Sequence, residues 1–133
     1  MQLTLVRHGE AAPAINGVDS KRPLTERGHL QAEQTAQFLK ETVQPDAYFP
    51  EVSVLICDKI KPEDDAKLAI EWLSQLPFER IVVVCHMNVV GHIAEQLTHE
   101  HFNPFALAEA RIYEQTVIAN GLSTQNKAFI PTV

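Results

Sequence analysis

Apolar and polar positions along this chain follow two periods, one typical of strands and one typical of helices. Short apolar runs, rich in β-branched residues, predict strands at residues 2–7, 52–57 and 80–85. Apolar side chains at helical spacing predict helices over residues 25–43, about 62–76 and 88–98. Two later runs, at 111–119 and 126–131, predict a hairpin around the turn signal Asn120-Gly121. This order predicts a three-layer α/β/α sandwich with a mostly parallel central sheet, in one domain spanning residues 1–133.

Two of the predicted strands end on a histidine. Arg7-His8-Gly9 follows the first strand, and His86 follows the strand at 80–85, with Asn88 placed to cap the next helix. Right-handed crossovers bring such junctions to the same edge of a parallel sheet. Arginine pairs with phosphate through two parallel hydrogen bonds, and histidine can carry a phosphoryl group covalently. The tripeptide alone also fits a capping arginine and a core histidine, but two histidines beside an arginine favour phosphoryl chemistry.

Three segments carry motifs in a fixed order: Leu5–Ala11, Arg22–Gly28 and Val82–Gly91. In order and approximate spacing they resemble the histidine phosphatase superfamily, and within it the small phosphohistidine phosphatases. The resemblance covers residues 1 to about 98.

That resemblance implies a phosphoglycerate mutase-like fold and a metal-independent phosphatase with a phosphohistidine intermediate. His8 is implied to be the nucleophile, while Arg7 and His86 are implied to hold the phosphoryl oxygens. The implied substrate is phosphohistidine in a partner protein. These roles agree with the needs of phosphoryl transfer, which are mainly in-line positioning and fixed positive charge.

The chain departs from the family at a second phosphate-binding arginine, because no arginine occurs between Arg27 and Arg80. In one alignment, residues 31–36 match the segment that carries it, with glutamine in its place. In the other, residues 23–40 are the intact first helix and a later βα unit is missing. We favour the second alignment because the apolar stripe continues through the helix after a Thr25 cap. Losing one such contact costs ~2–4 kcal/mol of transition-state stabilisation, so weak activity or phosphate binding without turnover stays open.

Several cations are candidates to replace the missing arginine, although a solvated surface cation is the ordinary interpretation of each. The candidates are Lys21, Arg22, Lys59, Lys61 and Arg111. Arg22 is the best of them, since the resemblance places its loop near the pocket. The predicted phosphate-binding residues are therefore Arg7, His86 and Arg22.

The candidate proton donors are Glu10, two residues after His8, and Asp58, at the end of a predicted strand. Both are equally compatible with ordinary solvent-facing carboxylates. A phosphoramidate leaving group takes its proton from water more readily than an ester does, so the lack of an obvious acid favours a phosphohistidine substrate.

Composition limits the other function classes. The net charge of −6 argues against non-specific nucleic-acid binding. No apolar run approaches a membrane span and no signal peptide precedes the first strand, so we expect a cytoplasmic protein. Cys57 and Cys85 lie in apolar runs, so we expect both to be reduced core residues. No pattern typical of a metal or nucleotide site occurs, and His99 and His101 are best interpreted as surface residues, so we expect no cofactor.

Three functions remain compatible with these patterns. The favoured one is a phosphohistidine phosphatase; the second is a catalytically weak or inactive relative that binds phosphate or a phosphorylated protein. A small-metabolite phosphomonoesterase is less favoured, because the short chain leaves little material for a substrate lid. A missing βα unit would also expose a sheet edge, so we expect a homodimer.

Overall fold

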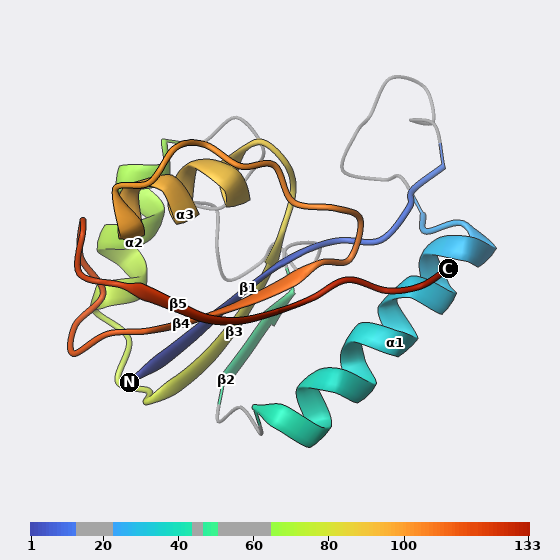
Figure 1. Cartoon of the computed structure of the whole chain (residues 1–133), viewed down its shortest axis with the longest axis horizontal. Helices are drawn as coiled ribbons and strands as arrows, with labels where there is room; N and C mark the ends of the chain where they lie inside the picture. The colour runs from blue at the N-terminus through green and yellow to red at the C-terminus, as the bar shows by residue number, and fades with distance from the viewer. Residues whose placement is uncertain (13–22, 44–46, 51–64) are drawn as a thin grey trace.

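The computed structural model describes residues 1–12, 23–43, 47–50 (backbone only) and 65–133 (Figure 1). Its strands are β1 (Gln2–Arg7), β2 (Ala47–Pro50), β3 (Arg80–Cys85), β4 (Ala110–Glu114) and β5 (Thr124–Phe129). Its helices are α1 (Glu26–Thr42), α2 (Ala66–Ser74) and α3 (Val89–Thr98). The strands form one five-stranded sheet in the order β2-β3-β1-β4-β5.

The sheet is mixed rather than mostly parallel, which corrects the expectation from the sequence. β2 and β1 both pair with β3 in parallel, whereas β4 pairs antiparallel with β1 and with β5. The parallel half consists of strands that are followed or preceded by helices, as crossovers require. The antiparallel half arises because the chain returns from α3 through a loop, without a further helix, and places β4 against β1.

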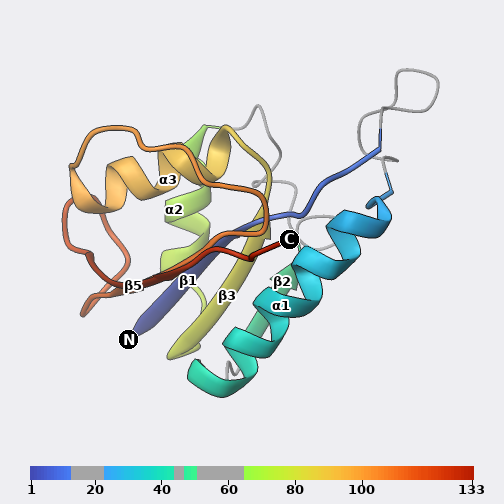
Figure 2. The same ribbon diagram turned by 45° about the vertical axis from the view of Figure 1, so that its right-hand side comes forward.

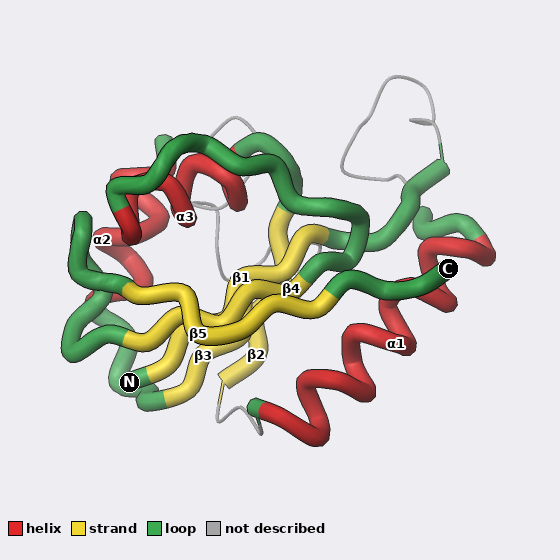
Figure 3. Tube along the Cα trace, in the orientation of Figure 1, coloured by secondary structure: helices red, strands yellow, loops and turns green. Residues whose placement is uncertain are grey.

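Helices cover both faces of the sheet, which gives the three expected layers (Figures 2 and 3). Successive strand residues point to opposite faces. Leu3 and Leu5 of β1 therefore pack in a core cluster with α2 and α3, whereas Val6 packs with Leu39 and Val43 at the end of α1. This alternation explains why β1 carries apolar side chains on both of its faces.

The first predicted helix is confirmed with nearly the predicted bounds. Thr25 caps α1, and its side chain accepts a hydrogen bond from the Gly28 amide. The favoured alignment, in which residues 23–40 are the intact first helix, agrees with this continuous helix. The other part of that alignment, the loss of a later βα unit, stays a prediction, because residues 51–64 lie outside the described chain.

The remaining elements agree with the predictions in part. The strand predicted at 52–57 lies outside the described residues, and the short strand β2 was not predicted. Asp65 is the N-cap of α2, and its side chain accepts a hydrogen bond from the Lys67 amide. Asn88 sits at the N-cap of α3 but makes no side-chain capping hydrogen bond. No helix in the described part of the chain is long and apolar enough to cross a membrane.

The predicted hairpin is present, with a shorter first strand and a longer connection than expected. β4 ends at Glu114, and β5 begins at Thr124. The buried side chains of Gln115 and Ser123 close this connection, with the Ser123 hydroxyl donating to Gln115 Oε1 at 2.8 Å. Asn120-Gly121 lies inside the connection, where Gly121 has a φ of 74°.

Candidate active site

The two histidines predicted to meet at one sheet edge lie side by side. β1 and β3 are adjacent and parallel, with Arg7 opposite Cys85 in the register, so His8 and His86 follow at the same level. The His8 amide donates to the Cys85 carbonyl oxygen at 3.1 Å. The two imidazole ring centroids are 4.2 Å apart, with an angle of 67° between the ring planes. The pairing of these strands, and not sequence proximity, brings the rings together.

The His8 ring has a defined tautomer. Its Nδ1 lies 2.6 Å from the carbonyl oxygen of Gly9. A carbonyl oxygen only accepts hydrogen bonds, so Nδ1 carries the proton and Nε2 carries the lone pair. Nε2 is therefore the atom of His8 that can attack an electrophile.

The glycine after His8 permits a close approach between the turn and α1. A Cβ at Gly9 would lie 2.6 Å from the Gly28 carbonyl oxygen, and a Cβ at Gly28 would lie 2.0 Å from the Glu10 carbonyl oxygen. Both contacts are to backbone, which cannot move aside as a flexible side chain can. The glycines of the first two motif segments are thus packed against each other, and this explains why both positions lack a side chain.

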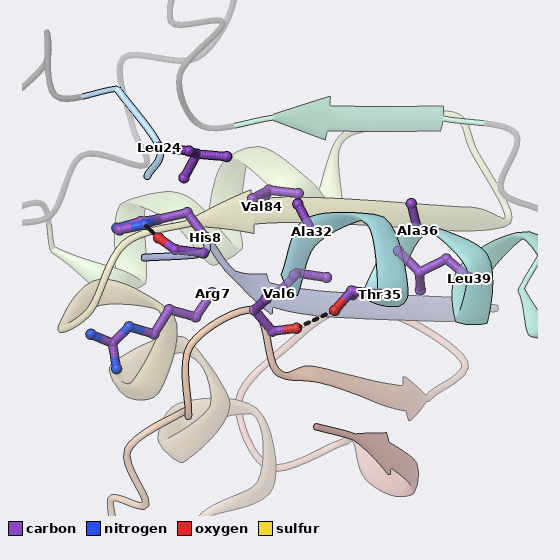
Figure 4. Close-up of a pocket in the computed structure, with 11 residues that line it drawn as sticks. Val6, Arg7, His8, Leu24, Ala32, Thr35, Ala36, Leu39 and Val84 are labelled. Atoms are coloured by element: carbon purple, nitrogen blue, oxygen red, sulfur yellow. Dashed lines mark hydrogen bonds between the residues drawn. The ribbon is translucent and has the colours of Figure 1, made fainter. Parts of the chain in front are cut away.

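Arg7 supplies a positive charge next to His8, and its guanidinium extends away from α1 (Figure 4). Its Nη1 donates to the Phe105 carbonyl oxygen at 2.8 Å, while its buried Nε has no hydrogen-bond partner among the described residues. Burial lowers the pKa of the Arg7 guanidinium below its ordinary value, although arginine stays protonated in proteins. A fixed guanidinium with unused donors is suited to binding an anion.

Glu10, one of the two predicted proton donors, is engaged with the start of α1. Its Oε1 accepts a hydrogen bond from the Thr25 hydroxyl at 2.8 Å, and its Oε2 lies 3.6 Å from Arg27 Nη1. Its backbone amide donates to Gln31 Oε1 at 2.8 Å. These contacts give Glu10 a structural role in attaching the turn to the helix, and a role as proton donor stays a prediction.

Arg111 is not available to replace the missing arginine, which corrects one candidate. Its guanidinium donates to Glu109 Oε2 at 2.7 Å and to the carbonyl oxygens of Asn103 and Pro104 at 3.0 and 2.9 Å. Burial would lower the pKa of Arg111, but the hydrogen bond and negative charge of Glu109 outweigh it and raise the pKa. Of these partners the sequence could indicate only Glu109, because the other two are backbone carbonyl oxygens.

The other predicted site residues fall outside the described chain: Arg22, Asp58, Lys21, Lys59 and Lys61. Their roles stay predictions. His99 and His101 are exposed, as expected. Within the described ranges, no group of three or more histidine, cysteine or acidic side chains is placed to hold a metal ion.

The structure adds residues that the motifs did not indicate. The buried Thr35 hydroxyl of α1 donates to the Ala108 carbonyl oxygen at 2.7 Å, and the Phe105 carbonyl oxygen holds Arg7. Backbone partners of this kind leave no sequence signal. Glu109, which immediately precedes β4, and Arg111 of β4 do leave a signal, because a spacing of two residues in extended backbone puts both side chains on the same face.

An apolar cavity of about 200 Å³ lies beside His8, between α1 and the sheet (Figure 4). Its apolar walls are Val6, Leu24, Ala32, Ala36, Leu39 and Val84. A cavity with these walls suits an apolar group and not a phosphate, so the charged chemistry belongs to the edge that carries Arg7 and the two histidines.

Comparison with known proteins bears on the family resemblance and on the fold. The sequence model of the histidine phosphatase superfamily (branch 1) matches residues 3–53. No curated protein matches the chain. The resemblance inferred from the sequence motifs is confirmed by this match and by the solved structures that share the fold.

Three solved structures have the same fold over nearly their whole length. The protein histidine phosphatase SixA complexed with tungstate is 22% identical, with a TM-score of 0.80, over 98% of this chain and 97% of that one. A putative phosphohistidine phosphatase SixA from Agrobacterium tumefaciens is 16% identical, with a TM-score of 0.78 and coverage of 98% and 97%. Another, from Nakamurella multipartitia, is 16% identical, with a TM-score of 0.82 and coverage of 99% and 96%. At these identities the likeness is one of fold, and the fold is the phosphoglycerate mutase-like one.

Proposed function

We propose that this chain, similar to the histidine phosphatase superfamily in sequence and to SixA in fold, is a phosphatase that acts on phosphohistidine in a partner protein. The observation that carries the proposal is the pair of imidazoles, His8 and His86, at a ring-centroid distance of 4.2 Å beside the Arg7 guanidinium. One ring presents a defined nucleophilic nitrogen. The other ring and the guanidinium supply hydrogen-bond donors and positive charge at the same edge.

The reaction proceeds in two displacements. In the first, Nε2 of His8 attacks the phosphorus atom and forms a new P–N bond while the P–N bond to the substrate imidazole breaks. The electron pair of that bond leaves with the substrate nitrogen, which takes a proton from water. In the second, a water molecule attacks phosphorus and loses a proton to the hydroxide left by the first displacement, the P–N bond to His8 breaks with its electron pair returning to Nε2, and inorganic phosphate is released.

Arg7 and His86 stabilise the charge on the equatorial oxygens during both displacements. Because these protein groups supply the positive charge, we expect the reaction to proceed without a metal, and we expect EDTA to leave its rate unchanged. Glu10 is held by Thr25 and Arg27, which favours a nitrogen leaving group that takes its proton from water. Two of the SixA proteins with this fold are named putative phosphohistidine phosphatases, which supports the same substrate class.

The first experiment is intact-mass spectrometry after brief exposure to phosphoramidate. Wild type should gain one acid-labile phosphoryl group, and His8→Ala should gain none while still binding inorganic phosphate. His92→Ala is the matched control, because this exposed histidine of α3 contacts Glu95 and lies outside the site. Equal labelling of wild type and His8→Ala would overturn the mechanism.

A second function, phosphate or phosphoprotein binding without turnover, is favoured by one observation. Arg111, one candidate for the missing second arginine, is engaged by Glu109 and two carbonyl oxygens. Absence of the phosphoryl adduct in wild type, together with phosphate binding by calorimetry, would support this function over the enzyme.

A further inference from the structure

A buried ion pair lies at the beginning of β4, outside the set of residues that the motifs indicate. Arg111 Nε and Glu109 Oε2 are 2.7 Å apart, and their side chains are 6% and 7% exposed. Burying two charges is costly, so a pair of this kind is weak evidence for a stabilising role. The contacts that the two side chains make with the preceding loop indicate a different role.

The pair organises the loop that precedes it. Arg111 donates to the carbonyl oxygens of Asn103 and Pro104, and its guanidinium lies 3.8 Å from the centroid of the Phe105 ring. Glu109 Oε1 accepts a hydrogen bond from the Ala106 amide at 2.7 Å. The residues on both sides of Phe105 are therefore bound to the pair, and the Phe105 ring packs against it.

The same loop is bound to the backbone and side chain of Arg7 and to the backbone of His8. The Phe105 carbonyl oxygen accepts the hydrogen bond from Arg7 Nη1 at 2.8 Å. The Ala108 amide donates to the His8 carbonyl oxygen at 3.1 Å, and the Arg7 amide donates to the Glu109 carbonyl oxygen at 3.1 Å. The loop thus forms a direct connection between Arg111 and the two residues that would contact phosphate.

We propose that Arg111 is a positioning residue that orients the Arg7 guanidinium through the Phe105 carbonyl. This inference rests on the proposed function, because it concerns how the Arg7 guanidinium is oriented to bind phosphate. Arginine suits the role because its planar fork can bond a carboxylate and two carbonyl oxygens at once, which a lysine ammonium cannot do in the same geometry. Glu109 completes the arrangement by neutralising the buried charge.

The test compares phosphate binding by Arg111→Met, Arg111→Lys and wild type, using inorganic phosphate and calorimetry. The dissociation constant should rise by roughly 10- to 100-fold in Arg111→Met, since displacing a binding group by about 1 Å has effects of that order. The rate of His8 phosphorylation by phosphoramidate should fall with it, and Arg111→Lys should restore only part of either loss. Unchanged phosphate affinity in a folded Arg111→Met would overturn the proposal.

Ser123→Ala is the control for a general loss of stability. It removes a buried hydrogen bond to Gln115 at the opposite end of β1, where the Gln115 amide donates to the Met1 carbonyl oxygen. The control should lower thermal stability and leave phosphate affinity unchanged. If it weakens phosphate binding as much as Arg111→Met does at equal stability, the effect of Arg111 is merely structural and the proposal fails.

Two further measurements separate the proposed role of Arg111 in orienting Arg7 from the proposed phosphatase function. Arg111→Met should weaken phosphate binding strongly in wild type and much less in Arg7→Lys, because lysine has no fork for the Phe105 carbonyl to orient; equal losses would contradict this. Side-chain ¹⁵N NMR should show a restricted Arg7 guanidinium in wild type and a mobile one in Arg111→Met. If wild type neither binds phosphate nor forms an adduct, the proposed function fails, and the NMR comparison still decides whether Arg111 positions Arg7.

Discussion

At the scale of single residues, the site depends on short contacts that fix the state of each group. The Gly9 carbonyl oxygen determines which nitrogen of His8 holds the proton, and the Phe105 carbonyl oxygen determines where the Arg7 guanidinium lies. Neither contact involves a second side chain. The motif therefore determines which side chains are present at the site. Backbone carbonyl oxygens, which every residue carries, determine how those side chains are oriented.

Replacing Arg7 tests its assigned role directly. Arg7→Ala should weaken phosphate binding and slow phosphorylation of His8, because it removes a charge-assisted contact to the phosphoryl oxygens. A loss of ~2–4 kcal/mol of transition-state stabilisation corresponds to a rate decrease of roughly 30- to 1,000-fold. Single-turnover labelling by phosphoramidate, followed by intact mass, measures this rate. Arg80→Ala is the control, since this exposed arginine begins β3, at the opposite end of that strand from His86; a comparable decrease there would count against a specific role for Arg7.

At the scale of elements, the start of α1 and the turn after β1 form one unit. Thr25 caps the helix and also contacts Glu10, while the Glu10 amide donates to Gln31 on the next helical turn. The contact between Gly9 and Gly28 closes this unit. The helix thereby holds the backbone that follows His8, which links helix docking to the geometry of the site.

Gly28→Ala tests that link by setting two effects against each other. Helix propensity alone would make alanine more stable by about 1 kcal/mol. The added Cβ would lie 2.0 Å from the Glu10 carbonyl oxygen, and relieving such a contact costs roughly 1–3 kcal/mol or more. Because backbone has to move, we expect the clash to prevail and the free energy of unfolding to decrease.

Chemical denaturation measures the outcome, with Glu33→Ala on the exposed face of α1 as the matched control. The displaced turn should also slow phosphorylation of His8 in Gly28→Ala under conditions where the variant is fully folded. A Gly28→Ala protein as stable and as reactive as wild type would show that the turn tolerates the displacement.

At the scale of the whole molecule, the sheet formed by the described residues has an edge strand on each side. β2 lies at one edge and β5 at the other, and residues 124–128 of β5 are all exposed. Exposed edge strands can pair with another chain unless something blocks them. Lys127 supplies one charge on β5, which is a common way to discourage such pairing.

We still expect a homodimer, with an edge strand as the contact. Light scattering over a micromolar concentration series should give twice the mass of the chain, shifting to the monomer on dilution. Ala128→Lys, which adds a second charge to β5, should lower the dimer fraction if β5 is the contact, while Glu33→Lys on α1 should leave it unchanged. A mass equal to one chain at every concentration would contradict the expectation.

Local patterns in the sequence were enough to predict several elements of this fold. The apolar runs of β1 and β3, the Thr25 cap and the Asn120-Gly121 signal predicted their segments because strand, helix and turn preferences act between near neighbours. The same patterns put His8 and His86 at strand ends, and right-handed crossovers then required a common edge. This much of the candidate site could be predicted.

The position of β4, the partners of Arg111 and the orientation of Arg7 depend instead on the folded chain as a whole. β4 lies against β1 and makes the sheet mixed, because a strand without a following helix carries no local signal of its neighbour. Arg111 is bound by Glu109 and backbone carbonyl oxygens instead of facing a substrate, and Arg7 depends on the Phe105 carbonyl oxygen. Most of these contacts are made through backbone groups that every residue carries, so no pattern of side chains could have specified them.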